Sequence, residues 1–267
     1  MAAVAPAPFK TSNPASDSVP DTPLPDAIWR ADQLGSYRSS PAASGYPELD
    51  RELPGGGWPP SVLVELLLPQ PGIGELRLLA PVLAPLTQAG KTVLLLAPPH
   101  IPFAPALRQL GLDLGNVLVV QADKPADRVW AAQQALKSAS LGALLCWLPQ
   151  VKAEHLRRLQ LAAAGGAGLA FVFRPWSAQE QSSPAPLRLR CQAAPSGKLA
   201  LEVFKRRGPA HGAAIVVPLP IPAVLIKPFM ARAAAVPTST ISDFPSHAVD
   251  RDSLAAIAAR RRSALAL

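Results

Sequence analysis

The stretch at residues 61–79, SVLVELLLPQPGIGELRLL, constrains the fold more than any other part of the chain. Residues 62–68 are apolar enough to form a strand that is buried on both faces of a sheet. A turn with Gly72 and Gly74 follows, and helix-forming residues begin at Glu75. Because a strand, a glycine-containing turn and a helix start are the context of a phosphate-binding loop, this order predicts the architecture of such a loop.

The residues that give such a loop its chemistry are only partly present. In the pattern G-x-x-x-x-G-K-[ST], Gly74 fits the second glycine, but Pro69 stands in place of the first. Glu75 replaces the phosphate-binding lysine, and Leu76 replaces the hydroxyl residue that binds Mg²⁺. A carboxylate repels a triphosphate where a lysine would attract it. We therefore expect a degenerate loop, formed by Pro69, Gly72, Gly74 and Glu75, and no cofactor.

Apolar runs alternate with helical patterns along the centre of the chain. Four further buried strands are expected at residues 92–96, 116–120, 142–148 and 168–173. Helices are expected between them, at residues 76–88, 104–110, 126–138 and 152–163. Because continuous apolar strands that alternate with helices are typical of a parallel sheet covered on both faces, we predict an α/β fold with a mostly parallel sheet.

The last two strands of this pattern differ from the others. Residues 187–191 and 199–204 alternate apolar residues with polar or small ones, and a turn at residues 195–197 joins them. This alternation indicates an antiparallel hairpin with one face in solvent, at the edge of the sheet.

Proline divides the chain into three parts. It accounts for 32 of 267 residues, about 12% against a usual ~5%, and it is concentrated toward both ends. Residues 1–43 are therefore expected to be mostly disordered, apart from a short amphipathic segment at residues 27–34. Residues 44–207 form the predicted core domain, and residues 208–267 a Pro/Ala-rich basic tail.

The tail carries most of the excess positive charge and ends in a predicted helix. The net charge of the chain is +8, and from Lys205 onward nine Lys or Arg face three Asp, which gives +6. This charge indicates either a solvated tail or attraction to an acidic partner or, weakly and without sequence preference, to DNA. The helix, at residues 254–265, would be frayed in solvent or would dock on a partner. Its candidate partner-binding residues are Leu254, Ile257, Leu265, Arg260, Arg261 and Arg262.

Cysteine usage and hydropathy point to a reducing, aqueous compartment. Cys146 and Cys191 give neither a disulfide framework nor a metal-ligand spacing. The first residues have no charged segment ahead of an apolar one, so we expect no signal peptide. The apolar run at residues 213–226 is shorter than the ~20 residues of a membrane helix and is broken by prolines. We expect a cytoplasmic protein that does not contact membranes.

The order of these elements resembles the core of RecA-type recombinases over residues 44–207. The runs that carry this resemblance are GYPELDREL at 45–53, GIGE at 72–75, GKT at 90–92, LGLD at 110–113 and LLC at 144–146. More closely, four segments resemble the ImuA family of RecA-like, SulA-related accessory proteins of bacterial mutagenic translesion synthesis. They are IWRADQL at 28–34, PGIGELR at 71–77, FVFRP at 171–175 and FKRRG at 204–208.

The resemblance to RecA implies that the ATPase site is lost. The phosphate-binding lysine of RecA falls on Glu75 and its hydroxyl residue on Leu76. The glutamate that activates water falls on Pro99, and the aspartate at the end of the fourth strand falls on Trp147. Phosphate binding, metal binding and water activation would all be missing. The resemblance therefore implies a protein that is not an enzyme and has no catalytic or metal-binding residues.

The ImuA resemblance implies an accessory protein of SOS-induced, error-prone DNA synthesis. Such a protein would bind an ImuB-like Y-family protein, RecA and, directly or indirectly, an error-prone C-family polymerase, and would join the nucleoid after DNA damage. Two alternatives stay open. One is a RecA-like ATPase with an altered phosphate loop, in which Arg77 or Lys91 would replace the missing lysine. The other is a SulA-like cell-division inhibitor that would bind a tubulin-like protein.

Overall fold

The computed structural model describes residues 40–207 and 213–226. The described residues up to Leu225 belong to one compact unit, which contains the described sheet. The amphipathic segment at 27–34 lies outside the described residues. So do the six candidate partner-binding residues of the predicted C-terminal helix, Leu254, Ile257, Arg260, Arg261, Arg262 and Leu265.

A mixed sheet forms the centre of the described structure, with the strand order β3-β2-β4-β5-β1-β6-β7-β8. Its strands are β1 Leu63–Leu68, β2 Thr92–Leu96, β3 Val117–Val120, β4 Leu141–Trp147, β5 Leu169–Pro175, β6 Leu187–Ala194, β7 Lys198–Lys205 and β8 Ile215–Pro218. Strands β1 to β6 run parallel to one another, and β7 and β8 add an antiparallel edge. The predicted α/β class, with a mostly parallel sheet, is confirmed.

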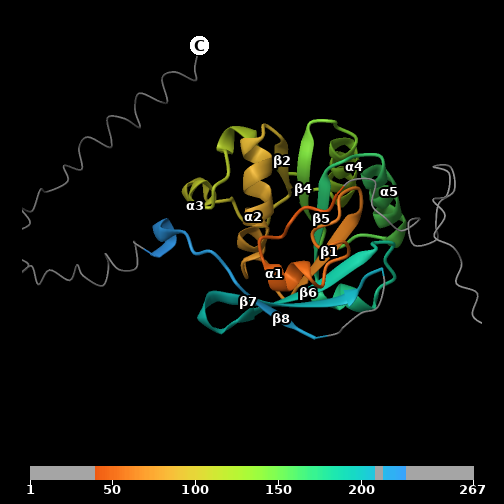
Figure 1. The fold of residues 1–267 in the computed structure, drawn as a ribbon. Coiled ribbons are helices and arrows are strands. Elements are labelled where there is room, and N and C mark those ends of the chain that lie inside the picture. Colours follow the sequence, from red (N-terminus) through yellow and green to blue (C-terminus); the bar gives the residue numbers. More distant parts are fainter. Residues whose placement is uncertain (1–39, 208–212, 227–267) are drawn as a thin grey trace, which may run out of the picture. The chain divides into compact units, whose positions relative to one another are not determined.

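Helices cover both faces of this sheet (Figure 1). They are α1 Pro47–Asp50, α2 Glu75–Gln88, α3 Ala104–Gln109, α4 Pro125–Leu136 and α5 Ala153–Ala164, with 3₁₀ turns at Leu114–Asn116, Trp176–Glu180 and Pro195–Gly197. Buried side chains of α1, α2 and α3 form one core with one face of the sheet. Those of α4 and α5 form a second core with the other face. Four helices lie within two residues of their predicted bounds, because each has an apolar stripe of helical period.

Helix α2 is continuous although Pro81 and Pro85 lie inside it. Each proline removes a backbone hydrogen bond, which costs about 3 kcal/mol in a helix interior. The inward face of the helix compensates, because Leu78, Leu79 and Leu83 are each at most 1% exposed. Burying one large aliphatic side chain contributes about 1.5–3 kcal/mol.

The two edges of the sheet differ from the sequence-based prediction. The predicted antiparallel β6–β7 hairpin is present in the antiparallel part of the sheet, but β6 pairs with β1, and β8 pairs with β7 and is the outermost strand. Strand β8 lies in a stretch that was predicted as linker. It forms because Val217 is fully buried. Pro218 is tolerated because it ends the outermost strand, where its missing N–H is not needed for pairing. At the opposite edge, β3 was predicted to be buried, but Leu118 is 52% exposed because β2 is its only partner in the described sheet.

Candidate functional site

The candidate site is the loop of residues 69–74, which joins the end of β1 to the first residue of α2. The structure therefore has the strand, glycine-containing loop and helix that the sequence predicted. Gly72 has φ +85° and Gly74 has φ +120°. Residues with a Cβ atom rarely adopt these angles, so both positions require glycine.

The loop binds the side chain of the helix that follows it. The backbone N–H of Gly72 donates to Glu75 Oε1 over 2.8 Å and to Oε2 over 3.1 Å. The N–H of Gly74 donates to Oε2 over 3.1 Å. Glu75 is only 5% exposed and is the first residue of α2, where the helix dipole also favours a negative charge. Backbone amides that would face a phosphate in a functional loop are thus occupied by a carboxylate of the same chain.

The charge of Glu75 also acts on a nearby cysteine. Cys191 is fully buried on β6. Burial raises the pKa of its thiol, and the charge of Glu75 raises it further. The thiol therefore stays protonated and unreactive at neutral pH.

A second element covers the loop from outside. We call residues 219–225, which follow β8, the strap. A Cβ atom on Gly74 would lie 2.4 Å from Leu219 Cδ1, so Leu219 packs directly on this glycine. Farther along the strap, the N–H of Val224 donates to Gln109 Oε1 of α3 over 2.8 Å. Between the loop, α3 and the strap, a cavity of about 210 Å³ remains, lined by Glu75 and Leu76 among others.

The other two positions that the resemblance to RecA assigns to an ATPase site belong to a different cavity. Pro99 follows β2 and Trp147 ends β4, and both line a cavity of about 390 Å³ together with Pro69. The structure thus separates the predicted site residues. Gly72, Gly74, Glu75 and Leu76 face the strap, whereas Pro69, Pro99 and Trp147 lie at the carboxyl ends of the strands.

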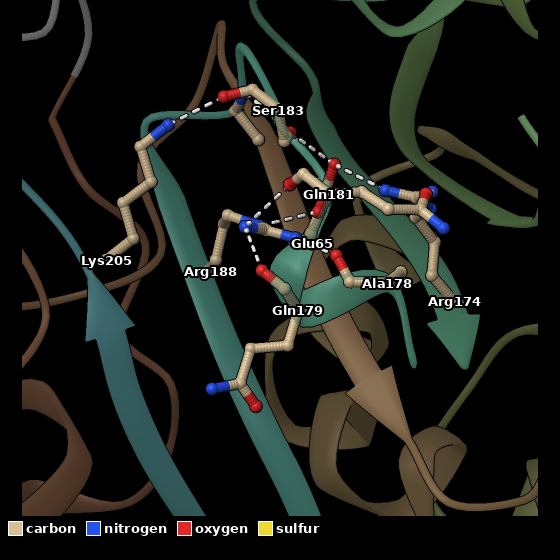
Figure 2. A network of polar contacts seen from close by, with 9 residues as sticks. Glu65, Arg174, Ala178, Gln179, Gln181, Ser183, Arg188 and Lys205 are labelled. Carbon is tan, nitrogen blue, oxygen red and sulfur yellow. Dashed lines mark hydrogen bonds and ion pairs between the residues drawn. The ribbon is translucent and has the colours of Figure 1, made fainter. Parts of the chain in front are cut away.

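Sequence analysis missed a charged network on the α4–α5 face of β1 (Figure 2). Glu65 is fully buried, and its Oε2 accepts from Arg188 Nε over 2.8 Å. Its Oε1 accepts from Ser183 Oγ over 2.5 Å and lies 3.6 Å from Arg174 Nη1. The available signal was one charged residue inside each apolar strand, at Glu65 and at Arg174. Charges in such positions are almost never buried without a partner.

Hydrogen bonds from this network hold the segment between β5 and β6, residues 176–186, in place. Arg188 donates to the carbonyl oxygens of Ala178, at 2.7 Å, and Gln179, at 3.2 Å. It also lies over the ring of Phe204, with 4.9 Å from Cζ to the ring centroid. Two buried guanidinium groups face one carboxylate. Burial lowers the pKa of Arg174, the charge of Glu65 raises it, and the charge of Arg188 lowers it.

Several kinds of site are absent from the described ranges. No group of three or more His, Cys, Asp or Glu side chains within residues 40–207 and 213–226 is arranged to hold a metal ion. No helix in this same part of the chain is long and apolar enough to cross a membrane.

Comparison with known proteins gives one consistent similarity. Residues 63–170 match the family model described as Cell division inhibitor SulA. Over 99 residues the chain is 32% identical to the Cell division inhibitor SulA of Yersinia pestis (strain Pestoides F) and, equally, to that of Yersinia pseudotuberculosis serotype O:1b (strain IP 31758). These alignments cover 37% of this chain and 59% of each relative. The chain is therefore similar to SulA from the start of β1 to the start of β5, a stretch that includes the Glu75 loop but neither β6–β8 nor the strap.

Proposed function

We propose that this protein is a non-catalytic RecA-like accessory protein of SOS-induced, error-prone translesion DNA synthesis, and that it acts by binding other proteins. The observation that carries the non-catalytic part is the hydrogen bonding of Glu75 to Gly72 and Gly74. The amides that would hold a phosphate already have an anion, and Leu219 covers the outer side of Gly74. A site closed in this way supports a binding role better than nucleotide turnover.

The translesion role is supported by segments outside the stretch that is similar to SulA. The ImuA-like runs at 28–34, 171–175 and 204–208 all lie beyond residues 63–170. In this proposal the partners are an ImuB-like Y-family protein and RecA, with a C-family polymerase recruited directly or through them. The protein would be cytoplasmic and would join the nucleoid after damage.

A SulA-like role in inhibiting cell division is the second candidate function. The match over residues 63–170, and the 32% identity to proteins of that name, favour it. In that case the partner would be a tubulin-like division protein. Both candidates belong to the SOS response, and they differ in the process that the protein controls.

Two measurements in the host bacterium separate the candidates. Deletion of the gene should lower the mutation frequency after ultraviolet irradiation several-fold if the protein serves translesion synthesis. Overexpression should leave cell length unchanged in that case, whereas a division inhibitor should produce filaments. A deletion strain with normal induced mutagenesis, together with filaments on overexpression, would refute the translesion proposal in favour of the second candidate.

A further inference from the structure

The cavity of about 390 Å³ opens at the carboxyl ends of the parallel strands. Its lining includes Leu68 at the end of β1, Ala97 after β2, Trp147 at the end of β4 and Pro175 at the end of β5. In open α/β sheets, ligands bind in the crevice outside the carboxyl ends of the strands. The volume is within the ~300–1,000 Å³ that is usual for binding pockets.

The walls of this cavity are rigid and apolar. Trp147 and Phe173 lie against each other, with ring centroids 4.5 Å apart and planes inclined by 31°. Six lining residues are prolines: Pro69, Pro71, Pro98, Pro99, Pro149 and Pro175. Proline fixes φ and has no N–H, so these walls are preformed but offer few backbone donors to a phosphate. An apolar side chain suits this cavity better than a nucleotide does.

The charge at the cavity is positive. Arg128 and Arg174 line it, and no Asp or Glu among the described residues does. Arg128 is half-buried and is fixed by its Nε, which donates to the Ala122 carbonyl oxygen over 2.6 Å. Behind the wall, Glu65 is shared between Arg174 and Arg188, so one of these two positive charges is not balanced within the network.

Buried donors at the same cavity lack acceptors. Trp147 Nε1 and the Nε and Nη1 atoms of Arg174 have no hydrogen-bond partner in the described part of the chain, and Nη1 has only the 3.6 Å ion pair with Glu65 Oε1. Buried polar groups are normally hydrogen-bonded, and each exception calls for an explanation. The two residues that carry these donors, Trp147 and Arg174, both line the cavity.

We propose that this cavity is a docking socket for an extended segment of a partner protein that inserts a large apolar side chain flanked by a carboxylate. Trp147, Phe173 and the prolines receive the apolar side chain, and Arg128 and Arg174 attract the carboxylate. An acidic segment is chosen because its charge is complementary to that of Arg128 and Arg174. The assumption that the occupant is a protein rests on the binding function proposed above. The residues that replace the water-activating and metal-supporting groups of RecA, Pro99 and Trp147, would thereby serve recognition.

Fluorine NMR of the full-length protein labelled with 5-fluorotryptophan tests the socket. Trp147→Phe assigns the Trp147 resonance, and the resonance of buried Trp58 reports whether the core stays intact. The probes are three peptides: Ac-Asp-Phe-Asp-NH₂, Ac-Asn-Phe-Asn-NH₂ and Ac-Lys-Phe-Lys-NH₂. We expect the acidic peptide to shift the Trp147 resonance, with an affinity up to about fivefold above that of the neutral peptide, as one partly exposed ion pair would give. The basic peptide should have no effect.

Two charge variants make the test specific. Arg128→Gln should reduce the preference for the acidic peptide, because only Arg174 then remains to attract the carboxylate, whereas Arg108→Gln on α3, outside the cavity, should leave it unchanged. The proposal is overturned if no peptide shifts the Trp147 resonance at about 10 mM, a concentration that detects even very weak complexes. It is also overturned if acidic and basic peptides act alike, if Arg128→Gln keeps the preference in full, or if ATP shifts this resonance instead. Failure here would leave the mutagenesis result standing, because that result is measured by gene deletion.

Discussion

The backbone N–H of Gly72 donates to the carboxylate of Glu75 over 2.8 Å, so the loop after β1 binds an anion that belongs to its own chain. Electrostatic repulsion alone would predict a loop that merely fails to attract phosphate. The observed contact does more, because an incoming phosphate would have to displace a buried carboxylate from Gly72 and Gly74. Compared with the lysine of a phosphate-binding loop, Glu75 thus both lacks the attraction for phosphate and occupies the amides of Gly72 and Gly74.

We predict no measurable ATP binding by the full-length protein in Mg²⁺. The triphosphate would compete with Glu75 for the same amides, and Leu219 covers Gly74. Isothermal titration calorimetry measures this directly, and a dissociation constant in the low micromolar range would contradict it.

Replacing Glu75 by lysine should not create an ATPase. Leu76, Pro99 and Trp147 still lack the groups that bind the metal and activate water. Phosphate release at the background rate is the expected result. Turnover by this single variant would show that the rest of the site is functional.

Glu75 should also stabilise the fold. Glu75→Ala leaves the buried amide of Gly74 without an acceptor and also removes the acceptor of the exposed Gly72, which should lower the free energy of unfolding by about 1–3 kcal/mol. Glu75→Gln keeps one acceptor oxygen and should lose less. Urea unfolding followed by circular dichroism measures both, and Glu48→Ala at an exposed position of α1 is the control, expected within about 0.5 kcal/mol of the parent. Equal stability of Glu75→Ala and the control would show that the contact is unimportant for folding.

Local patterns predicted most of the fold, and long-range pairings account for what they missed. The strands β1, β2, β4 and β5 and the helices between them follow from periodicity within a few residues. The position of β3 at an edge depends on the strand order, which periodicity does not encode. Strand β8 was missed because proline-rich flanks hide a four-residue strand that is stabilised by β7.

The candidate site shows the same difference between local patterns, which the sequence reveals, and long-range contacts, which it does not. The strand, loop and helix around Gly72 and Gly74 could be predicted from the sequence because their pattern is contiguous. The network of Glu65 could not be assembled in this way, because Arg174 and Arg188 lie more than a hundred residues away along the chain. The strap over Gly74 likewise begins far from the loop, at Leu219.

Any DNA binding by the full-length protein should be weak, independent of sequence and steeply dependent on salt. The basic residues of the tail would contribute a few phosphate contacts, and each contact releases counterions. A truncation that tests this must end at residue 225, because removal of β8 and the strap would disturb the core. Fluorescence anisotropy with a duplex of random sequence should show that the shortened chain loses most of the binding. Binding that survives both the truncation and salt of about 0.2 M would contradict this prediction.

The buried carboxylate of Glu65 should contribute far more to stability than the partly exposed one of Glu202. Glu65→Gln leaves Arg174 and Arg188 buried without a counter-charge, and the free energy of unfolding should fall by about 3–5 kcal/mol.

Glu202→Gln also removes an ion pair, the one between Glu202 and Arg190, but about a third of each of these two side chains is exposed. Water and salt screen such a pair, so its loss should cost no more than about 1 kcal/mol. Urea unfolding of the two variants at the same ionic strength compares them. Raising the salt concentration should narrow the difference between Glu202→Gln and the parent while leaving the Glu65→Gln defect in place, since the network around Glu65 is shielded from solvent. Similar losses in the two variants would mean that Glu65 does not hold the β5–β6 segment in place.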